Sequence, residues 1–298
     1  MEALGGQVIE ISDNSRSHLN PLDINEEYSE GANPYAFKSS FIMSLLELIM
    51  SDHALPPKKK SIIDRCTTLT LHDYVQSGYT SRPPTLKDFH QILKMQEEPE
   101  AQEIALEMEF FTTGTLSTFA NETNVDINKR IVSYDISGMG TQLSPIGLLI
   151  VLDSIFNRIT KNRELRRKTY IFIDEIYLLF KVENAANYLF TLWKRVRKYN
   201  AALTGITQNV SDMLQSHVAQ TMLANSELLV LLNQSPPDRE TLGKLLMLNN
   251  TEMDIISDAD VGSGLIKIEG DIIPFEDQFP KDTDLYRMMT TSPLEAMY

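Results

Sequence analysis

Hydrophobic positions change their spacing along the chain, and the changes separate segments with different expected structures. Alternating β-branched residues at 7–12 predict a strand near the start. From about residue 34 to residue 120 the apolar residues recur at helical spacing, and prolines separate the runs. This part of the chain predicts four helices, over residues 34–52, 58–75, 85–95 and 99–114.

After the helical segment, strands and helices alternate. Runs of Val, Ile, Leu and Phe predict strands at residues 130–137, 169–174, 201–207 and 227–233. Helices are predicted between them, at residues 144–162, 184–199 and 210–225. Apolar strands separated by helices indicate a parallel sheet that is covered on both faces. Beyond the prolines at 236 and 237 the sequence predicts two short helices, about residues 238–248 and 251–257, and then an antiparallel pair of strands, residues 264–270 and 271–276.

These patterns predict an α/β fold with an inserted all-α subdomain. We expect residues 1–30 to begin the α/β core and residues 31–126 to form the insert. Residues 127–298 would then supply the remainder of the core and a C-terminal hairpin.

Composition narrows the classes of function. The formal net charge of −14 argues against a chain that coats nucleic acid through bulk electrostatics, so any DNA contact would be local. Cys66 is the only cysteine, which excludes an internal disulfide and favours a reducing, cytoplasmic setting. The longest apolar run, residues 146–152, is far shorter than the roughly 20 residues of a spanning helix, so we expect no membrane span.

Two carboxylates follow a strongly apolar strand. Asp174 and Glu175 come directly after the predicted strand at 169–174, at the end where open α/β sheets place their ligands. In P-loop NTPases an Asp at this position holds Mg²⁺, and a neighbouring Glu polarises the attacking water. Alternatively, Asp174 caps the next element and Glu175 is simply solvated.

A basic run and an amide lie one strand–helix unit later. Arg195, Arg197 and Lys198 are close to the C-terminal end of a predicted helix, where the helix dipole favours cations in any case. An arginine here could instead reach a phosphate bound to a neighbouring subunit. Gln208 follows the next strand and either orients water or is an ordinary turn residue. Gly262 and Gly264 fit a hairpin turn.

Several segments together resemble a known family. They are GGQVIEIS, NPLDI, YIFIDEIYLLF, WKRVRKYNAALTGITQNVSDML and GSGLIKIEGD, in this order and with the helical segment between the second and the third. The combination resembles the C-terminal ATPase domain of the large VirB-type traffic ATPase of conjugative type IV secretion systems, in the version found on mobile elements of Gram-positive bacteria. The resemblance implies a RecA-like P-loop NTPase core that uses ATP and Mg²⁺.

The resemblance also implies roles for individual residues. Asp174 would hold the metal and Glu175 would be its Walker B partner. Gln208 would be the sensor amide, and Arg197 with Lys198 would form the trans-acting finger, with Arg195 as a weaker alternative. By the same resemblance, Gly262 and Gly264 match a turn that lies near the nucleotide base in relatives.

The chain departs from the family in one respect. Family members carry a Gly-rich loop ending in Gly-Lys-Ser/Thr between the first strand and a helix, and no G-x-x-x-x-G-K-[ST] occurs in this sequence. We therefore expect a core without its first strand and P-loop, so that this chain alone is weak or inactive toward ATP.

The resemblance implies partners and a location as well. It predicts a hexameric ring at the inner face of the cell membrane, in the cytoplasm, with other secretion ATPases and inner-membrane channel subunits as partners and DNA as an additional substrate. Two alternatives remain: a non-catalytic docking module of the secretion machinery, and a DNA-translocating motor of the coupling-protein or septal-translocase type.

Overall fold

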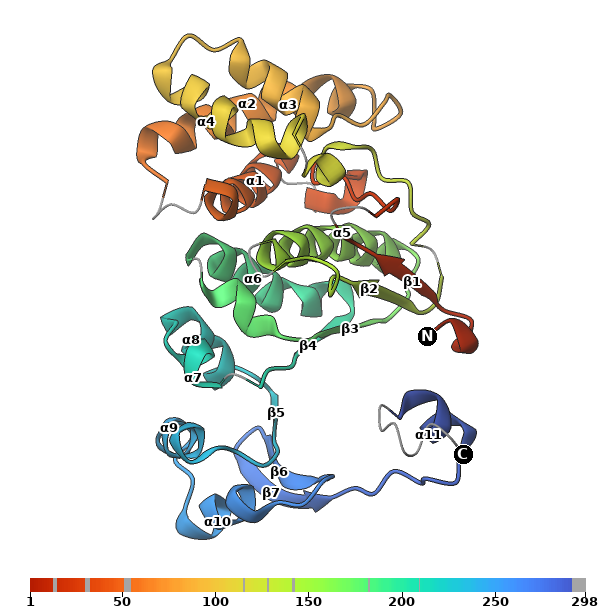
Figure 1. The fold of residues 1–298 in the computed structure, drawn as a ribbon, viewed down its shortest axis with the longest axis vertical. Coiled ribbons are helices and arrows are strands. Elements are labelled where there is room, and N and C mark those ends of the chain that lie inside the picture. The colour runs from red at the N-terminus through yellow and green to blue at the C-terminus, as the bar shows by residue number, and fades with distance from the viewer. Residues whose placement is uncertain are drawn as a thin grey trace. The chain divides into compact units, whose positions relative to one another are not determined.

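The computed structural model describes most of the chain as two compact units, residues 1–208 and 209–298, and each unit is described by itself (Figure 1). The described residues are 1–12, 15–29, 33–50, 55–114, 116–127, 129–140, 143–181, 183–208 and 210–290. The predicted domain boundaries after residues 30 and 126 stay predictions.

The four predicted helices are confirmed in the first unit. They are α1 (Pro34–Met50), α2 (Pro57–Gln76), α3 (Leu86–Lys94) and α4 (Pro99–Thr112); residues 51 and 52 of the first predicted helix lie outside the described residues. Local chemistry sets their starts, because α2 and α4 begin with proline and a capping box between Thr85 and Asp88 starts α3. Helix α1 also packs against the α/β part, so it joins the insert to the core.

The α/β part of this unit contains two parallel pairs of strands. Strand β1 (Gln7–Glu10) pairs with β2 (Val132–Asp135), and β3 (Thr169–Ile173) pairs with β4 (Ala201–Gly205). Two long helices follow β2 and β3, namely α5 (Ser144–Glu164) and α6 (Glu183–Arg195). Short 3-10 helices complete the unit: η1 (Glu2–Leu4), η2 (Glu26–Ser29), η3 (Ser117–Ala120), η4 (Ile176–Lys181) and η5 (Val196–Tyr199).

The expectation that both faces of the sheet are covered is wrong for β3. Ile171 and Ile173 are buried, whereas the side chains between them, Tyr170 and Phe172, are 62% and 69% exposed. A strand presents alternate residues to opposite faces, and an apolar run alone does not reveal whether both faces are packed. The α/β fold class is confirmed, but this strand is buried on one face.

The second unit is a small antiparallel sheet with helices. Its elements are α7 (Val210–Leu214), α8 (His217–Ala224), β5 (Leu228–Leu231), α9 (Pro236–Leu246), α10 (Asn250–Asp258), β6 (Ser263–Ile268), β7 (Asp271–Glu276) and α11 (Asp284–Met289). The predicted antiparallel pair is confirmed as β6 and β7.

Two expectations for this unit need correction. The single helix expected over residues 210–225 is two helices, because the Ser216 hydroxyl accepts the Ala219 N–H and starts a new helix there. Strand β5, expected in a parallel sheet, pairs antiparallel with β6. Within the described residues of the whole chain, none of the helices has the length and apolar character needed to cross a membrane.

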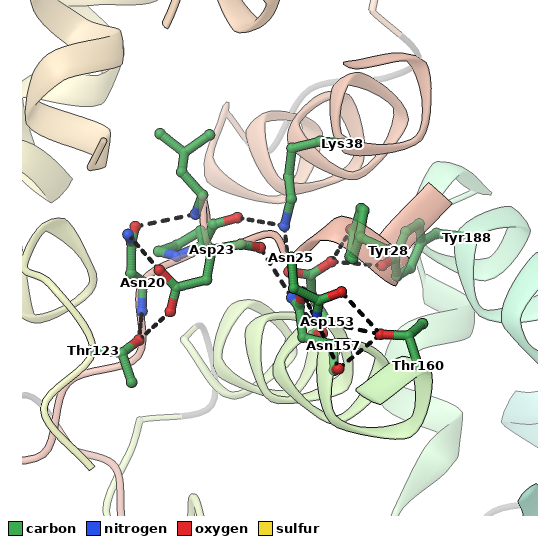
Figure 2. A network of polar contacts seen from close by, with 12 residues as sticks. Asn20, Asp23, Asn25, Tyr28, Lys38, Thr123, Asp153, Asn157, Thr160 and Tyr188 are labelled. Atoms are coloured by element: carbon green, nitrogen blue, oxygen red, sulfur yellow. Dashed lines mark hydrogen bonds and ion pairs between the residues drawn. The ribbon is translucent and has the colours of Figure 1, made fainter. Parts of the chain in front are cut away.

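A buried ion pair connects the helical insert to the α/β part (Figure 2). The Lys38 ammonium of α1 lies 2.5 Å from an Asp153 carboxylate oxygen of α5, and both side chains are almost completely buried. Lys38 also donates to the Pro21 carbonyl, at 3.0 Å. The other Asp153 oxygen accepts hydroxyl hydrogen bonds from Tyr28 and Tyr188, at 2.5 and 2.9 Å. Four segments of the chain therefore meet at one carboxylate.

Burial dominates the acid–base behaviour of this network. It lowers the pKa of Lys38, although the neighbouring Asp153 carboxylate partly compensates. It raises the pKa of the Tyr28 and Tyr188 hydroxyls well above the ordinary value, and the Asp153 charge acts in the same direction. Both tyrosines therefore remain donors to Asp153 at neutral pH.

A second group of polar contacts continues the network. The Asp23 carboxylate accepts hydrogen bonds from the Thr123 hydroxyl at 2.6 Å and from the Asn20 amide at 2.9 Å. The Asn157 amide of α5 donates to the Asp23 carbonyl, and the Asn25 amide donates to the Asn157 carbonyl. The loop that precedes α1 is thus tied to the middle of α5, from Asp153 to Thr160 (Figure 2).

We expect Lys38→Met to destabilise the first unit by about 3–5 kcal/mol, because it leaves the Asp153 carboxylate buried without a counter-charge. Adding Asp153→Asn should recover a large part of the loss, since the amide is neutral and still accepts from the tyrosines. The measurement is urea unfolding followed by fluorescence of the single tryptophan, Trp193 of α6.

The matched control is Lys58→Met. Lys58 pairs with Glu100 while 81% exposed, so its loss should cost less than about 1 kcal/mol. Equal costs for the two lysines would show that the buried pair does not hold the unit together.

Candidate functional site

The two predicted carboxylates lie at the carboxyl end of β3. Asp174 follows the last strand residue and is exposed, and its Oδ1 atom accepts the Glu175 N–H at 3.0 Å. Glu175 directly precedes η4. The sequence prediction for the position of this pair therefore agrees with the structure, because β3 ends directly before the carboxylates.

Glu175 has an unusual backbone and an unpaired carboxylate oxygen. Its φ angle is +50°, in the left-handed region that non-glycine residues occupy at a cost of roughly 1–2 kcal/mol. Its Oε2 atom is buried, and no described group forms a hydrogen bond with it. Strain and an unsatisfied buried acceptor at one residue are typical of a functional position, because stability alone would select against both.

Strand β4 holds this end of β3 in place. The Ile206 N–H donates to the Ile173 carbonyl at 2.8 Å, and the Ile176 N–H donates to the Ile206 carbonyl at 3.1 Å. A Cβ atom at Gly205 would lie 2.7 Å from the Ile176 Cδ1 atom, so a larger residue there would require the Ile176 side chain to move. Backbone hydrogen bonds to Ile206 therefore hold the chain on both sides of Glu175, at Ile173 and at Ile176.

Gln208 lies at the same edge as the carboxylates. Ile173 is opposite Gly205 in the parallel register, and Gln208 follows three residues later with an exposed side chain. The structure therefore places Asp174, Glu175 and Gln208 at one end of the β3–β4 pair.

Arg197 and Lys198 lie at the opposite end of the same pair. Both are exposed in η5, which leads into the start of β4, and the Thr169 N–H at the start of β3 donates to the Asn200 carbonyl just after η5. The length of β3 separates them from Asp174, which corresponds to roughly 17 Å along the strand. Within one copy of this unit the structure does not bring these cations to the carboxylates.

Arg195, the weaker alternative, has a packing role. Its guanidinium lies over the Phe37 ring, 4.7 Å from the ring centroid, so it covers the aromatic cluster between α1 and α6.

Gly262 and Gly264 belong to the second unit and have structural reasons to be glycine. Gly262 has a φ angle of +87°, and a Cβ atom there would lie 2.2 Å from the Asp277 carbonyl oxygen. At Gly264 a Cβ atom would lie 2.1 Å from the Leu231 carbonyl oxygen of the neighbouring strand. The sheet therefore requires both glycines, and a role near a nucleotide stays a prediction.

The carboxylate pair fits a hard divalent cation. Mg²⁺ keeps several of its waters and commonly takes only one or two carboxylates from the protein. Asp174 offers an exposed carboxylate, and Glu175 a buried oxygen without a partner. Among the described residues, this edge included, there is no cluster of three or more His, Cys, Asp or Glu side chains that could hold a metal ion.

Sequence reasoning overlooked the buried ion pair between Lys38 and Asp153. A signal was present, because Asp153 interrupts the apolar stretch from Ile146 to Phe156. A carboxylate within such a helix requires a buried partner, although the sequence does not indicate which lysine supplies it.

Backbone strain at Glu175 can be measured separately from its chemistry. We expect Glu175→Gly to be more stable than Glu175→Ala by about 1 kcal/mol, because both remove the carboxylate but only glycine relieves the left-handed conformation. The control is the exposed Glu103 in the middle of helix α4, where glycine should be less stable than alanine by about 1 kcal/mol. The same order at both positions would mean that Glu175 is not strained.

Comparison with solved structures shows the fold. VirB4 of Thermoanaerobacter pseudethanolicus superposes with a TM-score of 0.77 at 22% identity, over 99% of this chain and 79% of that chain. The bacterial conjugative coupling protein TrwBdeltaN70, in its unbound form, superposes with a TM-score of 0.51 at 15% identity, over 95% of this chain and 81% of that chain. A sequence search of curated proteins found no match.

The family is shown by sequence. The family model for the TraG P-loop domain matches residues 66–261, which is more than half of the chain and contains Asp174, Glu175 and Gln208. With the two structural similarities, this match confirms the resemblance to conjugative type IV secretion ATPases. The chain belongs to the TraG P-loop domain family.

Proposed function

We propose that this chain is part of the ATPase domain of a conjugative type IV secretion system, where ATP hydrolysis powers channel assembly and transfer of DNA or protein. One observation carries the proposal. At the carboxyl end of β3, Glu175 combines a strained backbone with a buried, unpaired carboxylate oxygen beside the exposed Asp174 carboxylate.

Each residue at that edge has a role that suits its position. Asp174 holds Mg²⁺ through its exposed carboxylate. Glu175 accepts a proton from the attacking water, and backbone hydrogen bonds of Ile206 hold the turn that carries it. Gln208 donates from its amide to orient that water. Bound Mg²⁺ supplies charge neutralisation of the phosphates.

Arg197 and Lys198 act on a neighbouring copy. Both side chains are exposed at the end of the β3–β4 pair opposite to Asp174. They reach a nucleotide only if another subunit places the carboxyl end of its own β3–β4 pair next to them. This geometry supports a ring, which we propose to be hexameric, at the inner face of the cell membrane with other secretion ATPases and channel subunits. Gly262 and Gly264 form the turn next to the base, and DNA remains a proposed substrate.

The proposal assigns the phosphate loop to residues other than 1–298. Residues 1–298 contain no G-x-x-x-x-G-K-[ST], and such a loop supplies the backbone N–H groups and the lysine that hold the phosphates. A segment of the same gene or another chain would supply it.

We expect Mg²⁺-dependent ATP hydrolysis from this chain when it is joined to an upstream segment that carries the phosphate loop, and little or none from the chain alone. In the joined protein, Glu175→Gln should lower kcat about 100-fold or more, because the water loses its base, while ATP binding is retained. Turnover and calorimetric binding are the two measurements. Unchanged turnover after Glu175→Gln would remove Glu175 from the mechanism.

Mixing variants tests whether the finger acts between subunits. Arg197→Ala and Glu175→Gln should each be inactive alone, yet mixed oligomers should recover part of the activity, because some interfaces combine an intact Arg197 with an intact Glu175. Lys94→Ala, an exposed lysine of α3, is the control and should keep full activity. Mixtures as inactive as the separate variants would exclude the trans arrangement.

A further inference from the structure

A cavity of about 280 Å³ lies beside the C-terminal half of α5, away from the carboxylates of the candidate site. Arg158, Lys161 and Arg167 line one part of it, and Val125, Ile127 and Leu165 line another. No aspartate or glutamate of the described chain is among its lining residues. The volume is at the lower end of that of small-molecule sites.

Local structure orients the cations. Arg166 has a φ angle of +54°, and this left-handed residue turns the chain back after α5, so that the Arg167 N–H donates to the Asn162 carbonyl at 2.8 Å. Arg158 is anchored by a hydrogen bond from its guanidinium to the Lys129 carbonyl. Neither Lys161 nor Arg167 forms an ion pair with any acidic side chain of the described residues.

Hydrogen bonds fix the amides in the wall, and those of Asn25 and Asn157 belong to the polar network beside the buried ion pair. Asn25 donates to the Asn157 carbonyl at 3.0 Å, and Asn162 donates to the Thr169 hydroxyl at 2.9 Å (Figure 2 shows Asn25 and Asn157). Side chains held in this way lose little conformational entropy when a ligand binds.

The positive charge is unusual for this chain. Its net charge is −14, yet residues 158–168 contain one acidic residue and several basic ones: Arg158, Lys161, Arg163, Arg166, Arg167 and Lys168. At physiological salt the Debye screening length is about 8 Å. The electrostatic potential in the cavity is therefore set mainly by the charged groups that line it, and acidic residues farther away contribute less. The dipole of α5 by itself favours a lysine near the C-terminal end of the helix. It does not explain why the chain turns after α5 so that Arg167 lines the cavity.

We propose that this cavity binds a small phosphorylated molecule. Two arginines and a lysine suit a dianionic phosphate, because a guanidinium pairs with two of its oxygens at once. The apolar wall of Val125, Ile127 and Leu165 receives a nonpolar group attached to the phosphate.

A half-open, concave pocket with an apolar wall suits a small ligand better than a nucleic acid. Two of the nearby cations outside the cavity lie over tyrosine rings, Arg163 over Tyr199 at 5.3 Å and Lys168 over Tyr170 at 5.2 Å. These two cations are therefore engaged by aromatic rings outside the cavity. The concave cavity with its apolar wall is the feature of this region that recognises a ligand.

The test is calorimetric titration of the chain with inorganic phosphate and with phenyl phosphate, in EDTA so that no Mg²⁺-dependent site contributes. We expect one site per chain, with phenyl phosphate bound about tenfold more tightly than inorganic phosphate because its ring is buried against the apolar wall. Leu165→Ser should remove most of this preference and leave the affinity for inorganic phosphate unchanged.

Matched double variants test the cations. Lys161→Ala with Arg167→Ala should weaken both ligands by at least about tenfold. Lys60→Ala with Lys94→Ala removes the same charge from α2 and α3 and should change neither affinity. Thermal unfolding of each variant checks that the fold is retained.

Three outcomes would overturn the proposal. Equal weakening by the two double variants would mean non-specific attraction. Equal affinity for the two phosphates, insensitive to Leu165→Ser, would mean a site for the bare anion. Binding of single-stranded oligonucleotides that tightens with length, without binding of phenyl phosphate, would mean a nucleic-acid surface.

Discussion

The Lys38–Asp153 ion pair is the contact on which the first unit depends. It joins α1 of the helical insert to α5 of the α/β part, and Tyr28 and Tyr188 add the preceding loop and α6 through the same carboxylate. A buried pair gains little over apolar residues of the same size, but loss of one partner is costly because the other charge stays desolvated. Such a contact therefore specifies one relative placement of insert and core more than it adds stability.

This placement matters for the candidate site because α6 participates in both. Tyr188 of α6 donates to Asp153, and α6 continues into η5, which carries Arg197 and Lys198 to the start of β4. Strand β4 then clamps the turn at Glu175 through Ile206. Helix α6 therefore connects the element that contacts Asp153 with the element that carries the cations at the start of β4.

Local sequence signals predicted the order and type of most elements, because prolines, capping residues and apolar periodicity act over a few neighbours. Asp174 and Glu175 were located for the same reason, since an apolar strand ends directly before them. Failures arose where distant contacts decide: the exposed face of β3 at Tyr170 and Phe172, and the antiparallel pairing of β5. The left-handed Glu175 gave no signal either, because glycine or asparagine is the usual residue in that conformation.

Helix α5 connects the buried pair with the basic cavity. Asp153 lies in its middle, and Asn157, one turn later, donates to the Asp23 carbonyl, accepts from Asn25 and also lines the cavity. Lys161 follows after one more turn, so a bound anion would lie about two turns, or roughly 12 Å, from the ion pair. A ligand that orders this end of α5 would favour the arrangement in which Asn25 and Asn157 are bonded, and this arrangement is the one that holds the loop before α1 against α5. A continuous set of hydrogen bonds through Asn157 therefore links the wall of the cavity to the loop that leads into the insert.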